Sequence, residues 1–394
     1  MRAGLILLCL SYVLSQFFRA FLAVLGGVLA NDIGATPENL SQASGFWFLS
    51  FAAMQIPVGW ALDRIGPRRT ASVLFLLGGG GGAVVFALAG NAFHVNIAML
   101  LIGIGCSPVL MASYYIFARQ FPVAQFATLA AVMVGVGSLG NLVASYPTAL
   151  AAETIGWRAT LWSLAAISVV VALGIAMTVR DPEPVQESTR GSLMDLFKMR
   201  ALWPIFPLMF VAYAPTAAIR GLWIGPYLTD VFDQTTNQVG QASLVMSIAM
   251  IAGTFFYGPL DRIFGTQKWV IFGGNLICAI AILALAALAD HSVGLSIALC
   301  AVIGLFGATF PVVVAHARSF VPAHLAGRGV TLINLFAIGG AGVFQFGSGP
   351  IYSTMNSGGG GQDAYAVLFT FFGLLALAGT AIYIFSTDKK PDQT

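Results

Sequence analysis

Two arginines lie deep inside apolar segments of this 394-residue chain, at corresponding places in its two halves. Arg19 lies in YVLSQFFRAFLAVL and Arg220 in YAPTAAIRGLWIGPYL, and each follows a tyrosine by seven residues. A guanidinium near the centre of a bilayer costs roughly 3 kcal/mol or more, so it is rarely kept without a function. No acidic residue lies in either stretch. Because a guanidinium binds carboxylate, phosphate or sulfonate through two parallel hydrogen bonds, the pair predicts an anion site.

Each arginine shares one helix face with polar and aromatic side chains, at spacings of three, four and seven residues. Structural roles for the arginines are the alternative: they could snorkel, bond helix carbonyls or stack on aromatic rings. Both lie too far into their segments to snorkel easily. The predicted substrate contacts are Arg19, Gln16 and Tyr12 in the first segment, and Arg220, Tyr213, Trp223 and Tyr227 in the seventh.

The elements that position these residues must be membrane helices. The chain is 58% hydrophobic and only 8% charged, whereas soluble domains average about 25% charged residues. A membrane span needs about 20 mostly apolar residues, and the apolar N-terminus is interpreted as an uncleaved first span. The predicted spans are 4–30, 41–61, 70–90, 94–118, 126–152, 158–179, 202–229, 240–260, 269–289, 293–315, 328–354 and 364–386.

A hydrophilic connection divides these spans into two sets of six. We predict an N-terminal bundle over 1–180, a cytoplasmic central loop over 181–201, and a C-terminal bundle with a short cytoplasmic tail over 202–394. If the N-terminus is cytoplasmic, fifteen Lys and Arg residues of the loops lie inside and only Arg158 lies outside. This bias predicts a multi-pass protein of the inner (plasma) membrane with both termini cytoplasmic.

The two halves repeat each other. The string LDRIG at 62–66 follows Arg19, and LDRIFG at 260–265 follows Arg220 at a similar distance. A further echo links ARQFP at 118–122 with ARSFVP at 317–322. The fold is therefore predicted to be all-α, with twelve transmembrane helices in two pseudo-symmetric six-helix bundles. Parallel repeats of this kind place a shared site near the midplane, between the halves.

The segment GWALDRIGPRR at 59–69 resembles the loop signature of the major facilitator superfamily (MFS) between its spans two and three. Residues 258–268 resemble its degenerate second copy, and Gly156-Trp157-Arg158 is also similar to that superfamily. The resemblance implies the MFS fold and alternating access by rocking of two bundles. The arginine pair resembles that of organophosphate:phosphate antiporters, and single arginines on these spans resemble those of organic-anion carriers. Met99 stands where the superfamily often has an arginine, and span five lacks the Gly-Pro pair of drug/proton antiporters.

A predicted gate lies at the cytoplasmic end of the spans. Asp63 closes span two there, where its carboxylate can accept hydrogen bonds from a neighbouring helix N-terminus. Nearby arginines can pair with it or with phospholipid head groups, and such a latch would have to break for inward opening. The alternative is that these charges only set the topology. The predicted gating residues are Asp63, Arg64, Arg68, Arg69 and Arg119, with Asp261 in the second half.

The predicted function is secondary active transport of a small organic or phosphorylated anion, held between Arg19 and Arg220. The alternatives are efflux of amphipathic drugs or metabolites and, as a minor one, a non-transporting receptor. We expect no enzymatic activity, cofactor or metal, because the apolar segments contain no nucleophile–base set and the cysteines are dispersed. All acidic residues lie in loops or at span ends, so coupling to H⁺, Na⁺ or a counter-anion stays open. The expected partners are the anion and the bilayer, with no nucleic acid, and the chain is expected to be a monomer.

Overall fold

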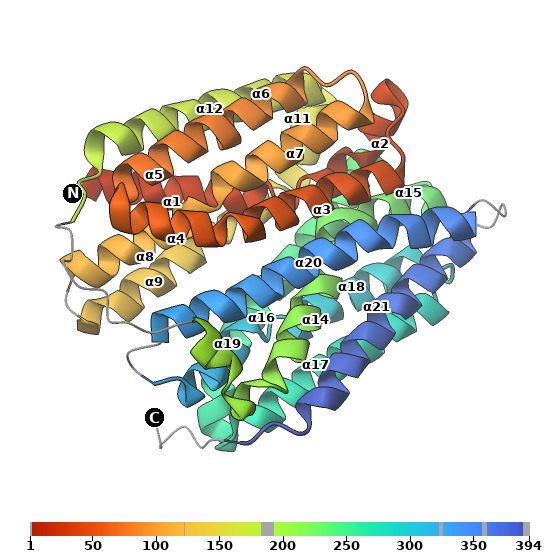
Figure 1. Cartoon of the computed structure of the whole chain (residues 1–394). Coiled ribbons are helices and arrows are strands. Elements are labelled where there is room, and N and C mark those ends of the chain that lie inside the picture. Colours follow the sequence, from red (N-terminus) through yellow and green to blue (C-terminus); the bar gives the residue numbers. More distant parts are fainter. Residues whose placement is uncertain (1, 122, 183–192, 323–325, 357–360, 389–394) are drawn as a thin grey trace. The chain divides into compact units, whose positions relative to one another are not determined.

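The computed structural model describes residues 2–121, 123–182, 193–322, 326–356 and 361–388 (Figure 1). The described residues form helices joined by short connections, and they divide into two compact units. Unit 1 comprises residues 1–188 and 235–241, and unit 2 comprises 189–234 and 242–394. The all-α prediction is confirmed. The predicted domain boundaries stay a prediction, and residues 183–192 of the predicted central loop lie outside the described part.

Unit 1 contains the first six predicted spans, several of them built from more than one helical piece. Its elements are α1 (Arg2–Phe17), α2 (Leu22–Ile33), α3 (Pro37–Ala53), α4 (Gln55–Arg64), α5 (Pro67–Leu74), the π-helix η1 (Phe75–Gly80), α6 (Gly81–Ala87), α7 (Ala92–Cys106), α8 (Pro108–Gln120), α9 (Val123–Gly137), α10 (Leu139–Val143), α11 (Tyr146–Thr154) and α12 (Trp157–Thr178).

Unit 2 contains the remaining spans, although the first six residues of α16, 236–241, are grouped with unit 1. Its elements are α13 (Leu193–Phe197), the 3₁₀-helix η2 (Arg200–Leu202), α14 (Ile205–Ala218), the π-helix η3 (Ile219–Trp223), α15 (Ile224–Phe232), α16 (Thr236–Phe264), α17 (Gln267–Ala287), α18 (Val293–Phe306), α19 (Phe310–Phe320), α20 (Ala326–Asn356) and α21 (Gly361–Tyr383).

The helices agree with the twelve predicted spans. Among the described residues, nine helices are long and apolar enough to cross a membrane, and three bent pairs pass the same test together. The bent pairs are α1 with α2, α3 with α4, and the helix ending at Val143 with α11, at angles of 55°, 40° and 40°. Spans one, two and five of unit 1 are therefore broken rather than straight. Since a break exposes backbone polar groups, each break must lie against protein or water.

Polar side chains fix where several helices begin. The Thr36 hydroxyl accepts a hydrogen bond from the Asn39 amide at 3.2 Å and opens α3. Asn91 opens α7 in the same way, through the amide of His94. In unit 2, Thr266 caps α17. These caps satisfy amides that have no partner within the first turn of a helix.

Glycines at matching places bring equivalent spans together in each unit. A side chain at Gly140 would collide with the carbonyl oxygen of Val13, so span five packs directly on the backbone of span one. A side chain at Gly340 would collide with the carbonyl oxygen of Phe210, so span eleven packs on span seven in the same manner. The internal duplication is therefore visible in the packing as well as in the sequence.

Candidate functional site

Arg19 lies in the break of span one. α1 ends at Phe17 and α2 begins at Leu22, and the residues between them form turns. Within this break, the amide of Arg19 donates to the Gln16 carbonyl at 3.4 Å, which is the tighter i to i−3 pattern. Span one therefore bends by 55° at Arg19, the residue that the sequence predicts to bind the anion. Broken helices of this kind form substrate sites in many transporters.

The guanidinium of Arg19 stacks on two aromatic side chains of α3. Its Cζ lies 5.1 Å from the ring centroid of Trp47 and 5.1 Å from that of Phe51. The stacking alternative is therefore partly correct. Stacking uses the flat face of the guanidinium, whereas its N–H groups point outward in its plane. The Nε atom of Arg19 is buried and has no hydrogen-bond partner among the described residues.

Trp47 belongs to this site and was missed from the sequence. Its side chain is fully buried, and its indole Nε1 has no hydrogen-bond partner in the part of the chain that the structure describes. The buried amide oxygen Oε1 of Gln16, one turn before Arg19, also has no hydrogen-bond partner among the described residues. The predicted contact Tyr12 is also buried, and its ring packs against Gly137 of α9. Trp47 sits in an aromatic run, FWFLSF, which gave no signal beyond ordinary core packing.

Arg220 lies in the π-helix η3 of span seven. Pro215, inside α14, has no N–H to donate to the preceding turn, and η3 begins four residues later. Arg220 is only 2% exposed. Single π-helical turns inside α-helices are frequently found at functional sites. Both sequence-predicted arginines therefore occupy irregular backbone in the interior of their spans.

The other predicted contacts of span seven use their polar atoms inside unit 2. The indole Nε1 of Trp223 donates to Ser348 Oγ at 3.0 Å. The Tyr227 hydroxyl donates to the Ala289 carbonyl at 2.6 Å, and it lies 2.7 Å from Ser296 Oγ. Both aromatic side chains are fully buried. Their substrate contacts stay a prediction, and the structure shows them anchoring span seven to its neighbours.

The remaining contact, Tyr213, is half-buried beside Phe310, with ring centroids 6.3 Å apart. A separate cavity of about 730 Å³ lies between α4 and α5 and does not include Arg19. Its lining is mainly apolar, and the Trp60 and Val73 side chains in it are 61% and 50% exposed. Such exposure is expected on a surface that faces acyl chains, so we do not place the substrate there.

The predicted gating residues of unit 1 lie at the basic ends of α4, α5 and α8, and Asp261 lies near the end of α16 in unit 2. The N-terminus of α5 is held by Asp181, a residue that the sequence analysis did not single out. Its Oδ1 accepts from the Arg68 amide at 2.7 Å, and its Oδ2 lies 3.6 Å from Arg68 Nε. Unit 2 repeats this arrangement, because Asp388 accepts from the amide of Lys268 at 3.2 Å. In the sequence, each of these aspartates is the first acidic residue after a span, Asp181 after span six and Asp388 after span twelve.

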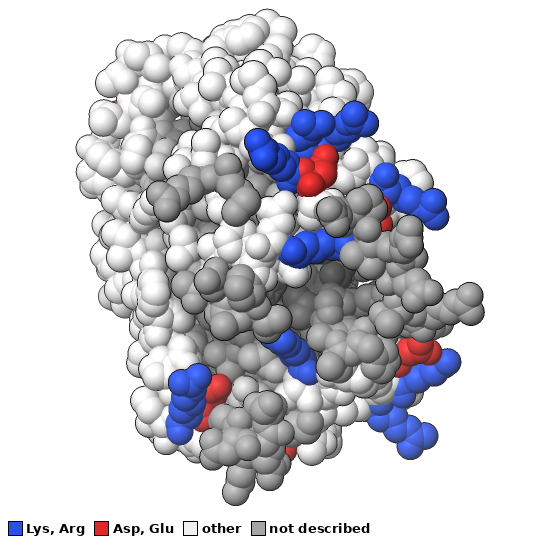
Figure 2. Space-filling view, turned by 90° about the vertical axis from the view of Figure 1, so that its left-hand side faces the viewer, with Lys and Arg blue, Asp and Glu red and all other residues white. Residues whose placement is uncertain are grey.

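The carboxylate of Asp63 has different neighbours from that of Asp181. It lies beside the hydroxyl of Tyr115, and the Arg119 guanidinium stacks on that tyrosine ring with Cζ 4.3 Å from the centroid. Arg64 and Arg69 are exposed. In unit 2, Asp261 accepts from Gln267 Nε2 at 3.4 Å. Figure 2 shows basic side chains on this face with acidic ones beside several of them. The latch and the membrane orientation stay predictions.

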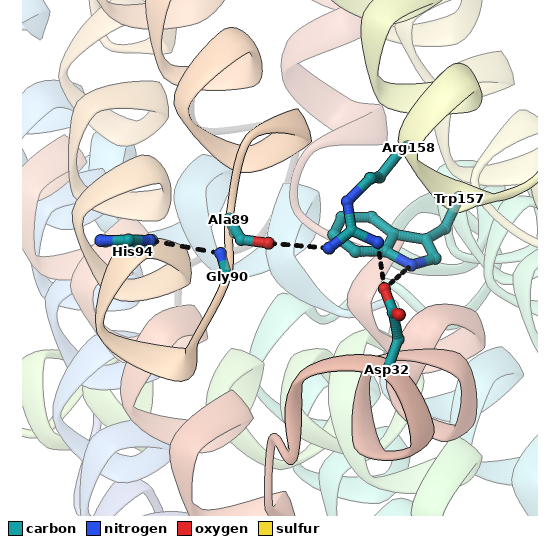
Figure 3. A network of polar contacts seen from close by, with 6 residues as sticks. All are labelled: Asp32, Ala89, Gly90, His94, Trp157 and Arg158. Atoms are coloured by element: carbon teal, nitrogen blue, oxygen red, sulfur yellow. Dashed lines mark hydrogen bonds and ion pairs between the residues drawn. The ribbon is translucent and has the colours of Figure 1, made fainter.

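The opposite end of unit 1 carries a polar network (Figure 3). Asp32, at the end of α2, accepts hydrogen bonds from Trp157 Nε1 at 2.9 Å and from Arg158 Nη1. Arg158 Nη2 also donates to the Ala89 carbonyl at 3.1 Å. These bonds join the ends of spans one, three and six. In unit 2, a carboxylate likewise links the ends of two spans: the Tyr365 hydroxyl donates to Asp230 Oδ2 at 2.5 Å.

Comparisons with known proteins agree with this architecture. Residues 8–223 and 205–394 each match the family model of the Major Facilitator Superfamily. The sialic acid transporter NanX of Escherichia coli is 23% identical over 93% of this chain and 91% of its own length. The flippase LtaA of Staphylococcus saprophyticus, a proton-coupled antiporter, is 23% identical over 73% of this chain and 71% of its own.

The probable sulfoacetate transporter SauU of Cupriavidus necator is 24% identical, but the match spans only 48% of this chain and 44% of that transporter. Among solved structures, a D-xylose–proton symporter has a TM-score of 0.78 at 15% identity, with 100% of this chain and 99% of that chain covered. A bacterial homologue of the human lysosomal transporter Spinster has a TM-score of 0.75 at 17% identity, with 97% and 96% covered. At these identities the structures establish the fold alone. Since the family model matches both halves, the chain belongs to the Major Facilitator Superfamily and is a membrane-embedded secondary transporter.

Proposed function

We propose that this transporter carries a small organic anion, and that Arg19 and Arg220 bind it from spans one and seven. The observation that carries the proposal is the irregular backbone at both arginines, a 55° break in span one and a π-helix in span seven. Irregular backbone at membrane depth is tolerated only where it is buried in protein or lines a water-filled cavity. An intramembrane cation at such a place is a functional residue by default.

The names of several relatives support an organic acid as the substrate. They include transporters of sialic acid and, by probable assignment, of sulfoacetate. A 4-hydroxybenzoate transporter of Pseudomonas putida is 25% identical over 155 residues. A carboxylate or sulfonate group matches the bidentate geometry of arginine. These names favour an organic acid over the phosphorylated anion that the sequence left open.

Uptake into proteoliposomes tests the proposal. Carboxylates, sulfonates, organophosphates, and neutral and cationic compounds of similar size would be compared, each with a pH gradient, with a Na⁺ gradient and with preloaded anion. We expect uptake of organic anions by the wild type and none by Arg19→Gln or Arg220→Gln. The gradient that accelerates uptake identifies the coupling ion. Uptake of neutral or cationic compounds, with no anion transported, would overturn the proposal.

A second candidate is export of an amphipathic compound, and one observation favours it. The flippase LtaA, named as a proton-coupled antiporter, is 23% identical over 73% of this chain, although the sialic acid transporter matches a longer stretch, 93%. The same proteoliposomes distinguish the candidates if fluorescent amphiphiles are added to the panel. Export of a neutral amphiphile that survives Arg19→Gln would place this candidate first.

We propose that the gate at the basic end is formed by Asp63, Arg64, Arg68, Arg69 and Arg119, with Asp261 in the second half. Because Asp181 already accepts the Arg68 amide, Asp63 is not needed to cap α5. Its carboxylate is instead placed beside Tyr115, on whose ring Arg119 stacks. Asp181 then stabilises the bundle, and the Asp63 carboxylate takes part in gating.

A further inference from the structure

We infer that the anion bound by unit 1 also carries a hydroxyl group, so that the substrate class is a hydroxylated organic acid, and that Trp47 donates a second hydrogen bond to its acidic head. The inference rests on the proposed function and adds the chemistry that selects among anions. It follows from four buried polar atoms on spans one and two. Two of these atoms are donors and two are acceptors.

The two donors belong to side chains that touch. Arg19 Nε and Trp47 Nε1 are both buried without a hydrogen-bond partner among the described residues, and the Arg19 guanidinium lies over the Trp47 ring. A buried donor left without an acceptor is destabilising. An indole N–H can only donate. An acidic group with two oxygens therefore satisfies both donors at once.

The two acceptors require something that a carboxylate lacks. The amide of Gln55 is oriented by its own hydrogen bond, because Nε2 donates to the Phe51 carbonyl at 3.1 Å. Its Oε1 is buried, and within the described ranges it accepts no hydrogen bond. Gln16 Oε1 is in the same condition. An ionised acid cannot donate to these oxygens and would be repelled by them, whereas a hydroxyl donates to them.

The spacing of these residues puts each acceptor about one helical turn from Arg19 or from a ring on which Arg19 stacks. Trp47 and Phe51 lie four residues apart on one face of α3, and Gln55 continues this row across the 40° bend into α4, where its Nε2 donates to the Phe51 carbonyl. Gln16 precedes Arg19 by three residues on span one. Gln55 lies two turns, roughly 12 Å, beyond Trp47, but only one turn, about 5 Å, beyond Phe51, on whose ring the Arg19 guanidinium stacks. A hydroxyl a few bonds from the acidic group fits this separation.

Unit 2 does not repeat the Trp47 donor. A side chain at Gly103 would collide with the carbonyl oxygen of Trp47, and one at Gly304 would lie 2.7 Å from that of Met246. Met246 therefore occupies the position equivalent to Trp47, and the methionine side chain has no N–H to donate. The selectivity that we infer is built into unit 1 alone.

Binding to the purified full-length protein tests the inference with matched pairs of acids. The probes are glycolate against acetate, 3-hydroxypropionate against propionate, and 4-hydroxybenzoate against benzoate. We expect the hydroxylated member of at least one pair to bind about tenfold more tightly to the wild type. Gln55→Met should reduce that ratio to about one while weak binding of the plain acid persists.

Trp47→Phe keeps an aromatic ring beside Arg19 but removes the indole N–H and part of the buried ring volume, and it should weaken both members of that pair about equally, by roughly five- to tenfold. Trp203→Phe is a control for the loss of an indole N–H at an exposed tryptophan, since Trp203 is 59% exposed and donates to the Phe197 carbonyl. Affinity ratios within one variant do not depend on how much of the protein is folded. Equal affinities for every pair in the wild type, or unchanged affinities in Trp47→Phe, would overturn the inference.

Failure of the inference is distinguishable from failure of the proposed function. If plain and hydroxylated acids bind the wild type equally and Arg19→Lys weakens both, the anion site stands and only the hydroxyl selectivity is wrong. If no acid binds while neutral or cationic compounds do, the proposed function fails and the inference fails with it.

Discussion

Replacing Arg19 by lysine separates the charge of this residue from its shape. Arg19 makes no ion pair with a described residue, and its Cζ lies 5.1 Å from the rings of both Trp47 and Phe51. A lysine ammonium keeps the charge and can approach the same rings. Each ring contact is worth about 0.5–1 kcal/mol and is largely retained. The loss falls on the planar fork, which a lysine cannot form.

The expected magnitude follows from that loss. One charge-assisted hydrogen bond is worth about 1.5–3 kcal/mol. Arg19→Lys should therefore weaken anion binding roughly 10- to 150-fold. Arg19→Met removes the charge as well, and it should abolish anion binding. Because it also removes a buried cation without a carboxylate partner, its Tm without ligand should be no lower than that of the wild type.

The assay is calorimetric titration of the purified protein with the anion that the uptake panel identifies, together with the Tm of each variant without ligand. The Tm values show whether a variant has folded, so that a loss of binding is not confused with a loss of structure. An Arg19→Lys protein that folds and binds the anion within twofold of the wild type would refute the reasoning. Arg19 would then be a packing residue that stacks on Trp47 and Phe51.

Three further predictions test the gate and the packing of the bundle. Asp63→Asn should slow transport several-fold while leaving the anion affinity nearly unchanged, as measured by uptake rates and titration. The reason is that it shifts the populations of the inward- and outward-facing states and does not alter the pocket. Unchanged uptake would mean that the charges of the 59–69 loop serve only to set the membrane topology. Asp181→Ala should lower the stability by about 1 kcal/mol through loss of the α5 cap, and a Tm equal to that of the wild type would contradict this. Gly140→Ala should destabilise unit 1 strongly, because its Cβ would collide with the backbone of span one, whereas Gly135→Ala meets nothing within 4 Å and should leave the Tm of the purified protein unchanged.

The sequence alone determined the membrane fold and the two arginines. Hydrocarbon has no water to hydrogen-bond the backbone, so a spanning segment must be a long apolar helix and can be read from composition. For the same reason a cation within a span stands out at once. The repeat was readable because LDRIG and its copy after Arg220 lie in loops of similar sequence. The receptor alternative gives way to the family match, which makes the chain a secondary transporter.

Only the tertiary structure decided which side chains surround each arginine. Helical spacing predicts the residues on the same helix face, and it found Gln16 near Arg19. It cannot predict contributions from another span, and so it missed Trp47 of α3 and Asp181 at the end of span six. The same limit applies to Trp223 and Tyr227, which share a stripe with Arg220 but are hydrogen-bonded to Ser348 and Ser296. A periodic pattern reports the direction of a side chain from its own axis, whereas the partner that it meets depends on how the other helices pack.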